Sequence, residues 1–156
     1  MKSTVYIETT IPSFYYETRT GAEFVAMQNW TRQWWNERKD TYNCFISIAV
    51  LDELENGNHP KKEEKILLLT GIESLEINDE IEEIVEVYIT NYLMPKDIVG
   101  DALHFAIASF YKMDYLLTWN CNHLANANKK KHVRRINERL RLSTPEIITP
   151  LEVMED

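Results

Sequence analysis

DALHFAIASFYKMDYLLTWNCNHLAN, residues 101–126, joins a helical pattern to a strand-like pattern. In its first ten residues the apolar side chains recur every three or four positions, which predicts an amphipathic helix. The apolar run at 115–119 is long enough for a buried strand and too short for a helix. The expected buried face of the helix consists of Val99, Ala102, Leu103, Ala106, Ile107 and Phe110, and the opposite, exposed stripe consists of Asp97, Asp101, His104 and Ala108.

Polar side chains gather where these two elements meet. Asp101 begins the helix, and Asn120 and Asn122 follow the strand. In open α/β sheets, ligands bind at the carboxyl ends of the strands. We therefore expect a site at that edge of the sheet.

Short apolar runs alternate with helical patterns along the rest of the chain. The pattern predicts strands at 3–10, 44–46, 75–77, 115–119 and 147–149, and helices at 22–39, 48–55, 61–70, after Asn78, around 101–110 and between 123 and 142. Ser47 and Asn78 have the side chains that favour helix N-caps. No hairpin turn joins two of the strands, which indicates a mostly parallel sheet covered by helices on both faces. The length suits a single domain over residues 1–156.

Composition excludes several classes of protein. No stretch approaches the roughly 20 apolar residues of a membrane span, and the first residues lack a signal-peptide pattern, so we expect a cytoplasmic protein without membrane contact. The two cysteines, Cys44 and Cys121, form neither a disulfide framework nor a zinc spacing. The net charge of −8 argues against non-specific binding to long nucleic acid.

One basic cluster stands out in this acidic chain. It predicts a surface for RNA phosphates, or alternatively a solvated helix face or a contact for an acidic partner. The cluster consists of Lys129, Lys130, Lys131, Arg134, Arg135, Arg139 and Arg141, and Glu138 is the one acid within the same stretch.

Three carboxylates come from separate elements. Glu8 lies at the end of the first expected strand, where a buried carboxylate is costly unless it is hydrogen-bonded, paired or bound to metal. Its alternative role is to cap the turn into Pro12. Glu53 lies on a short helix and Asp101 begins the central one. Oxygen ligands without His or Cys suit Mg²⁺ or Mn²⁺.

The chain resembles a known family in three ordered segments. YIETTIPSFY (6–15), VLDELENG (50–57) and the stretch 101–126 are similar to the motifs of PIN-domain nucleases, and in particular of their VapC-like toxin branch. The resemblance implies an α/β/α sandwich of three layers and metal-dependent cleavage of RNA. By motif position, Glu8, Glu53 and Asp101 would be the catalytic acids and the ligands of Mg²⁺ or Mn²⁺.

The last motif departs from the family pattern. The family usually carries Asp at the position of Asn120 and often another Asp at that of Asn122, and each amide removes a negative charge and cannot act as a base. We therefore expect weak metal affinity. Asn120 is expected to position a metal-bound water as part of the catalytic set, and Asn122 to help from the rim. Thr9 and Thr118 are expected to hydrogen-bond to the groups that hold the metal.

Two functions follow from the resemblance. The first is an endoribonuclease acting on RNA as the toxin of a type II toxin–antitoxin pair, with an antitoxin protein as partner. The alternative is a catalytically degenerate module of the same fold that binds RNA or a protein. A phosphate-binding loop is not indicated, because the four glycines are scattered. The aromatic stripe predicts a homodimer, through Met27, Trp30, Trp34 and Trp35.

Overall fold

The protein is built on a five-stranded sheet in which every pairing is parallel. The structure is a computed structural model and describes residues 2–91, 99–120 and 127–153. The strand order is β3-β2-β1-β4-β5, so the first strand of the chain lies in the middle. The strands are β1 (Thr4–Ile7), β2 (Asn43–Ser47), β3 (Glu73–Leu75), β4 (Tyr115–Leu117) and β5 (Glu146–Ile148).

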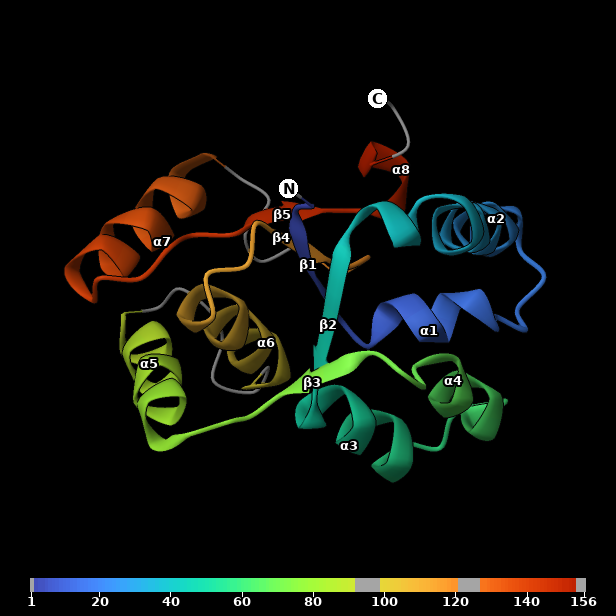
Figure 1. Ribbon diagram of the computed structural model, residues 1–156, viewed down its shortest axis with the longest axis horizontal. Coiled ribbons are helices and arrows are strands. Elements are labelled where there is room, and N and C mark those ends of the chain that lie inside the picture. The colour runs from blue at the N-terminus through green and yellow to red at the C-terminus, as the bar shows by residue number, and fades with distance from the viewer. Residues whose placement is uncertain (1, 92–98, 121–126, 154–156) are drawn as a thin grey trace.

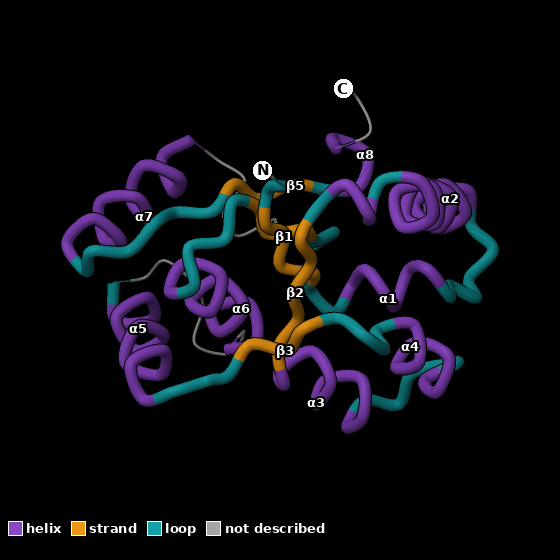
Figure 2. Tube along the Cα trace, viewed as in Figure 1, coloured by secondary structure: helices purple, strands orange, loops and turns teal. Residues whose placement is uncertain are grey.

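Helices cover both faces of the sheet, which confirms the three-layer α/β/α fold. Figure 1 shows α5, α6 and α7 on one side and α1, α2 and α4 on the other, with α3 beside β3. Figure 2 shows the same arrangement as helices around a central column of strands. The helices are α1 (Thr10–Tyr15), α2 (Ala22–Glu37), α3 (Ile48–Asn56), α4 (Lys62–Leu68), α5 (Asp79–Thr90), α6 (Val99–Phe110), α7 (Ala127–Arg139) and α8 (Pro150–Val153), with a 3-10 turn at Lys39–Thr41.

Strand β1 is the centre of the hydrophobic core. Val5, Tyr6 and Ile7 are fully buried, because the strand has a neighbour on each side and helices above and below it. Each such aliphatic side chain contributes about 1.5–3 kcal/mol relative to an exposed position. This burial fixes the position of the residues that follow Ile7.

Helix α6 is buried more completely than its periodicity predicts. Ala102, Ala106 and Ile107 are buried, as expected, but so are His104 and Ala108 on the stripe predicted to be exposed. That prediction is wrong because α6 lies in the middle of its layer, packed against α5 as well as the sheet. Asp101, in the first turn, remains partly exposed.

Local signals placed most helix starts correctly. The Ser47 hydroxyl accepts a hydrogen bond from the backbone N–H of Ala49, and the Asn78 side chain accepts one from the N–H of Ile81, which confirms both N-caps. Helix α1 was not predicted. It contains Pro12 at its third position, where the backbone nitrogen has no intrahelical acceptor and proline is tolerated.

The aromatic stripe of α2 is divided between core and surface. Trp34 is fully buried, so it does not contribute to the predicted aromatic surface, whereas Met27, Trp30 and Trp35 are partly exposed. The homodimer stays a prediction. In the residues that the structure describes, no helix combines the length and apolar character needed to cross a membrane.

A buried amide joins the helices of one layer. The Asn137 side chain of α7 accepts a hydrogen bond from the Tyr88 hydroxyl of α5 at 2.6 Å. Its Nδ2 donates to Ser109 of α6 at 3.2 Å and to the Thr144 hydroxyl at 3.0 Å. Burial raises the pKa of Tyr88 to about 12, so this hydroxyl is a neutral donor. We call these four residues the Asn137 network.

Candidate active site

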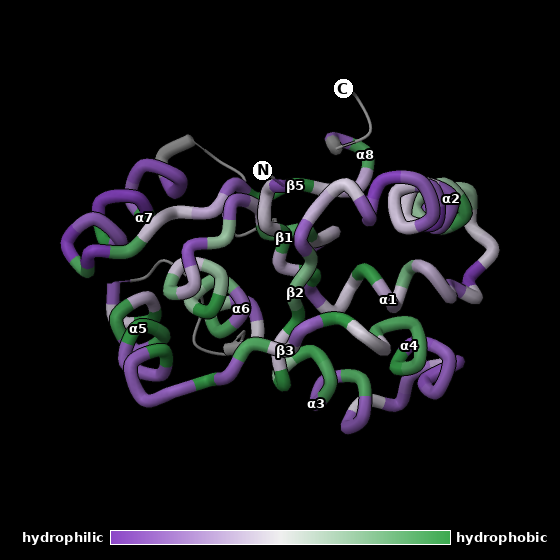
Figure 3. Tube along the Cα trace, viewed as in Figure 1, coloured by the Kyte–Doolittle hydropathy of each residue, from purple (hydrophilic) through white to green (hydrophobic). Residues whose placement is uncertain are grey.

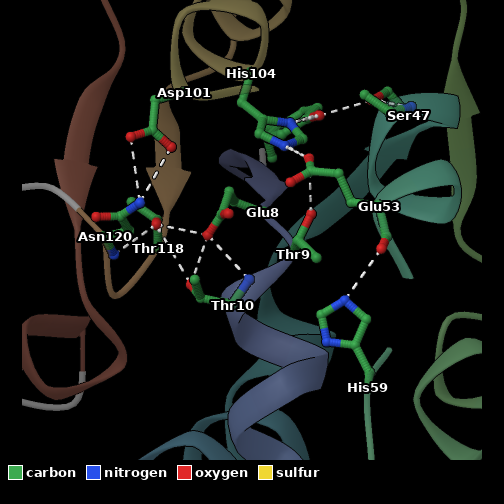
Figure 4. A network of polar contacts seen from close by, with 12 residues as sticks. Glu8, Thr9, Thr10, Ser47, Glu53, His59, Asp101, His104, Thr118 and Asn120 are labelled. Atoms are coloured by element: carbon green, nitrogen blue, oxygen red, sulfur yellow. Dashed lines mark hydrogen bonds and ion pairs between the residues drawn. The ribbon is translucent and has the colours of Figure 1, made fainter. Parts of the chain in front are cut away.

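The strand order creates a crevice between β1 and β4. From β1 the chain adds β2 and β3 on one side of the sheet, and it then crosses to add β4 and β5 on the other. Connections that leave two such neighbouring strands diverge at their carboxyl ends, and this is where open α/β sheets bind ligands. Glu8 directly follows β1 and Thr118 directly follows β4. Figure 4 shows the polar residues that gather there.

Glu8 is buried and held through one of its oxygens. Only 5% of its surface is exposed. Its Oε1 accepts hydrogen bonds from the Thr10 backbone N–H at 3.0 Å, the Thr10 hydroxyl at 2.5 Å and the Thr118 hydroxyl at 2.7 Å. These donors offset the cost of burying a carboxylate. Within the described residues no donor reaches Oε2, so this oxygen is the one positioned for a ligand.

Glu53 reaches the same region from α3. Its Oε1 accepts hydrogen bonds from the Thr9 hydroxyl at 3.2 Å and from His104 Nε2. Its Oε2 lies against the first turn of α6, 3.6 Å from where a Cβ on Gly100 would be. Partial burial raises the pKa of Glu53, but the hydrogen bonds from His104 and Thr9 and the positive charge of His104 together outweigh it, and the net pKa is lowered. Glu53 is therefore ionised at neutral pH.

His104 lies among the three predicted acids. Burial lowers the pKa of His104, but the hydrogen bond to Glu53 and the negative charges of Glu8, Glu53 and Asp101 outweigh this, and the net pKa is raised. The other ring nitrogen, Nδ1, is 2.6 Å from the Tyr6 hydroxyl. When the ring is protonated it donates to both partners.

Tyr6 extends this chain of hydrogen bonds to the start of α3. Its hydroxyl lies 2.7 Å from the Ser47 hydroxyl, which is the N-cap of that helix. Burial raises the pKa of Tyr6 far above its ordinary value, so the phenol remains neutral. Glu53 and the ring that binds it are thus both fixed relative to α3.

Asp101 is bound by the amide of Asn120. The Asn120 Nδ2 lies 3.2 Å from each carboxylate oxygen of Asp101. The backbone N–H of Asn120 donates to the Thr118 hydroxyl at 2.9 Å, which joins this pair to the Glu8 cluster. The first turn of a helix favours a negative charge such as that of Asp101.

The predicted site residues are therefore largely brought together. Glu8, Glu53, Asp101, Asn120, Thr9 and Thr118 form one connected region, whereas Asn122 lies outside the described residues. Sequence reasoning missed Thr10 and Tyr6 and left His104 outside the catalytic set. The hydroxyl of Thr10, two residues after a buried acid, was the one local signal available, since short side chains often bond to nearby groups.

The predicted basic residues lie along one side of α7. Lys130, Lys131, Arg134 and Arg135 are exposed on α7, and Lys129 is partly buried at its start. The opposite face of α7 is anchored by buried apolar side chains, and Figure 3 shows the helix as hydrophilic along most of its length. Lys130 and Arg134 line a pocket together with Thr144, Pro145 and Glu146, at the amino end of β5.

The carboxylate oxygens of Glu8, Glu53 and Asp101 are suitable ligands for a hard cation, but the three side chains are not close enough together to coordinate one ion directly. In the part of the chain that the structure describes, no three His, Cys, Asp or Glu side chains are placed to hold one metal ion together. Mg²⁺ keeps several of its waters when it binds proteins, so carboxylates at greater separation bind it through water. Carboxylate oxygens are among the ligands that such a hydrated cation prefers.

Comparisons with known proteins support the fold. No family model and no curated protein matches the sequence. The chain is similar in structure to VapBC2 from Rickettsia felis bound to a DNA fragment from their promoter, with a TM-score of 0.53 and 15% identity over 94% of this chain and 98% of that one. It is also similar to FitAcB from Neisseria gonorrhoeae, with a TM-score of 0.54 and 12% identity over the same shares. At these identities the likeness shows the fold alone.

Proposed function

We propose that this protein is a metal-dependent endoribonuclease whose acids are Glu8, Glu53 and Asp101. One observation carries the proposal. Carboxylates from three separate elements surround a single buried histidine at the crevice between β1 and β4. A fold has no structural need to collect three negative charges there, and perturbed ionisable groups in a crevice are typical of catalytic sites.

Mg²⁺ or Mn²⁺ is the proposed cofactor. Glu8, Glu53 and Asp101 would hold it, directly or through water, by oxygens that these hard cations prefer. When bound, such a cation lowers the pKa of a water molecule and neutralises charge on a phosphodiester.

The surrounding residues of the chain keep the acids in place. Thr10 and Thr118 hold Glu8 through its Oε1, which leaves Oε2 directed to the ligand. Thr9 and His104 hold Glu53. Fixed carboxylates cost less ordering entropy when a ligand binds, which is the benefit of such supporting hydrogen bonds. Asn120 is proposed to orient a water while its amide remains near Asp101.

RNA is the proposed substrate, and α7 is its proposed phosphate contact. Such contacts would come from Lys129, Lys130, Lys131, Arg134 and Arg135. Clustered cations on one helix attract the polyanion to the protein and reduce repulsion by the net charge of −8.

The proposed biological role is that of a toxin with a separate antitoxin protein as partner. Two observations support it: the sequence resembles VapC-like toxins, and the fold is similar to that of the VapBC2 complex. The proposed homodimer would use the partly exposed Met27 and Trp35.

A binding module without catalysis is the second candidate. It is favoured by the Asn120 amide, which donates to both oxygens of Asp101 and so satisfies this acid without a cation. In that case the same surface would bind RNA or a protein without cleaving it.

The test is cleavage of a fluorophore–quencher RNA with Mn²⁺ or Mg²⁺ and with EDTA. We expect cleavage that EDTA abolishes and that Asp101→Asn or Glu53→Gln lowers by at least 100-fold, since each removes a negative charge that the cation requires. Asp79→Asn is the matched control for the first variant, because Asp79 also lies in the first turn of a helix. Asp52→Asn is the control for the second, since Asp52 is the exposed neighbour of Glu53.

The two candidates predict different results. If Asp101→Asn and wild type are equally inactive with either metal while both bind the RNA, the nuclease proposal fails and the binding module stands. Equal activity of wild type and both active-site variants would point to a contaminating nuclease.

A further inference from the structure

Three aromatic side chains lie next to the acids, on the opposite side of the β4 end. Trp119 is one residue before Asn120 in the chain, but its ring extends toward α1 and α2. The ring is stacked with Trp30 of α2, with centroids 6.4 Å apart and planes at 28°. Phe14 of α1 also packs on it, at 6.1 Å and 59°. All three side chains are only partly buried, unlike the fully buried Trp34.

Trp119 is fixed by two hydrogen bonds. Its indole N–H donates to the Thr31 hydroxyl at 2.8 Å, and Thr31 is fully buried. Its backbone N–H donates to the Thr10 hydroxyl at 2.9 Å, and the same hydroxyl donates to Glu8. The aromatic group and the first acid are therefore held by one side chain, so their relative position is set by the fold.

We propose that Trp30 and Trp119 form a stacking site for an unpaired nucleobase of single-stranded RNA. The inference rests on the proposed function and names the form of RNA that the site takes. Aromatic faces bind any unstacked base, and proteins that recognise single strands use them in this way. A base inside a duplex is already stacked on both faces and is excluded.

The aromatic pair lies where it could position an RNA strand relative to the acids. Asn120, with Asp101, lies on the α6 side of the β4 end, and Trp119 lies on the α1 and α2 side. An RNA strand that crosses this edge would place one phosphate at the proposed cation site between the acids, while a neighbouring base stacks on Trp30 and Trp119. Aromatic rings that are already held in place lose little conformational freedom on binding. A base stacked on them would therefore determine, at low entropic cost, which phosphodiester bond lies at the acids.

The test measures binding without cleavage, in EDTA. A fluorescein-labelled ten-nucleotide oligoadenylate is compared, by fluorescence anisotropy, with an abasic oligomer of the same length and charge and with an oligoadenylate–oligouridylate duplex. We expect wild type to bind the single strand about tenfold more tightly than either competitor, which corresponds to loss of one stacked base. Trp30→Leu is expected to lose this preference and keep the abasic affinity.

Trp35→Leu is the matched control, because Trp35 is a partly exposed tryptophan of the same helix that packs on Tyr15 and Trp34. It is expected to bind as wild type does. Equal affinity of wild type for the base-bearing and abasic oligomers, or an unchanged preference in Trp30→Leu, overturns the stacking site.

A second measurement removes any dependence on how the variants fold. Long-wavelength irradiation of wild type with a 5-iodouridine-containing RNA, followed by peptide mass spectrometry, is expected to place adducts on Trp30 or Trp119. Adducts confined to other residues overturn the proposal. Because both measurements are made without metal, they remain valid if the protein fails to cleave RNA. If the protein cleaves RNA but binds base-bearing and abasic oligomers equally well, the stacking site is refuted and the proposed nuclease function is not.

Discussion

At the scale of single residues, the candidate site depends on hydrogen bonds between side chains that lie far apart in the chain. Glu8 was predicted to be buried at the end of a strand, because a carboxylate there interrupts an apolar pattern, and it is 5% exposed. The contacts of His104 with Tyr6 and Glu53 join residues 98 and 51 positions apart. No local pattern encodes such a distance, and therefore the central role of His104 became visible only in three dimensions.

The pair formed by His104 and Glu53 gives stability a defined pH dependence. The pKa of His104 is raised above 6.5, so its contribution is complete below about pH 6.5 and is lost as pH rises through the folded pKa. The pKa of Glu53 is lowered below 4.5, so its contribution is complete above about pH 4.5 and is lost as pH falls. The pair therefore contributes most between about pH 4.5 and 6.5.

His104→Gln tests this dependence. We expect the variant to unfold more easily by about 1–2 kcal/mol within that pH window, with a smaller difference above it, since Glu53 is 43% exposed and water screens the pair. Urea unfolding in EDTA at pH 5.5 and 8.5 measures the difference. The exposed His132→Gln is the control, and a difference that does not depend on pH would show that the charge of His104 plays no part.

At the scale of elements, the residues near a helix start predict its first residue more accurately than the local sequence predicts where a strand ends. The cap residues Ser47 and Asn78 act through neighbours two or three positions away, so the sequence contains all the information needed. Strand ends depend on pairing partners. The first strand was predicted to continue to residue 10, but it ends at Ile7, where the chain turns into α1. Proline at the third position of α1 concealed that helix.

Removing one cap measures how much this local signal contributes. Asn78→Ala deletes the acceptor for the Ile81 N–H at 2.9 Å and is expected to lower the free energy of unfolding by about 1 kcal/mol. Thermal unfolding, followed by circular dichroism, measures it as a shift of about 2–4 °C for a chain of this size. Asn58→Ala, at an exposed loop position, should leave the midpoint unchanged. An unchanged midpoint in Asn78→Ala would mean that packing alone positions α5.

At the scale of the whole molecule, alternation of strands and helices predicted the parallel sheet but not its strand order. The central place of β1 and the crossing from β3 to β4 follow from which faces pack, and these depend on all the helices at once. The Asn137 network belongs to this scale as well, since it connects three elements of one layer. Asn137 appeared in the sequence only as one polar residue within a basic helix.

Asn137→Ala should destabilise the entire domain. It removes the amide that accepts from the buried Tyr88 hydroxyl and donates to Ser109, and we expect a loss of about 2–3 kcal/mol. Glu138→Ala, at the exposed neighbouring position, is the control. Chemical unfolding followed by both tyrosine fluorescence and far-ultraviolet circular dichroism should show a single coincident transition at lower denaturant. Two separate transitions in the variant would mean that α7 unfolds independently.

The central position of β1 also determines when the acids can meet during synthesis. β1 is synthesised before its neighbour β4, which lies about 110 residues later in the chain, and Glu8 gains the Thr118 hydroxyl only when β4 pairs. Pairings between such distant segments form late, because a long loop must close first. A nascent chain that has not yet reached β4 therefore carries Glu8 and Glu53 without the contacts that β4 brings to Glu8. If the protein cleaves RNA, the ribosome that makes it is exposed to that activity only after β4 has been translated and paired.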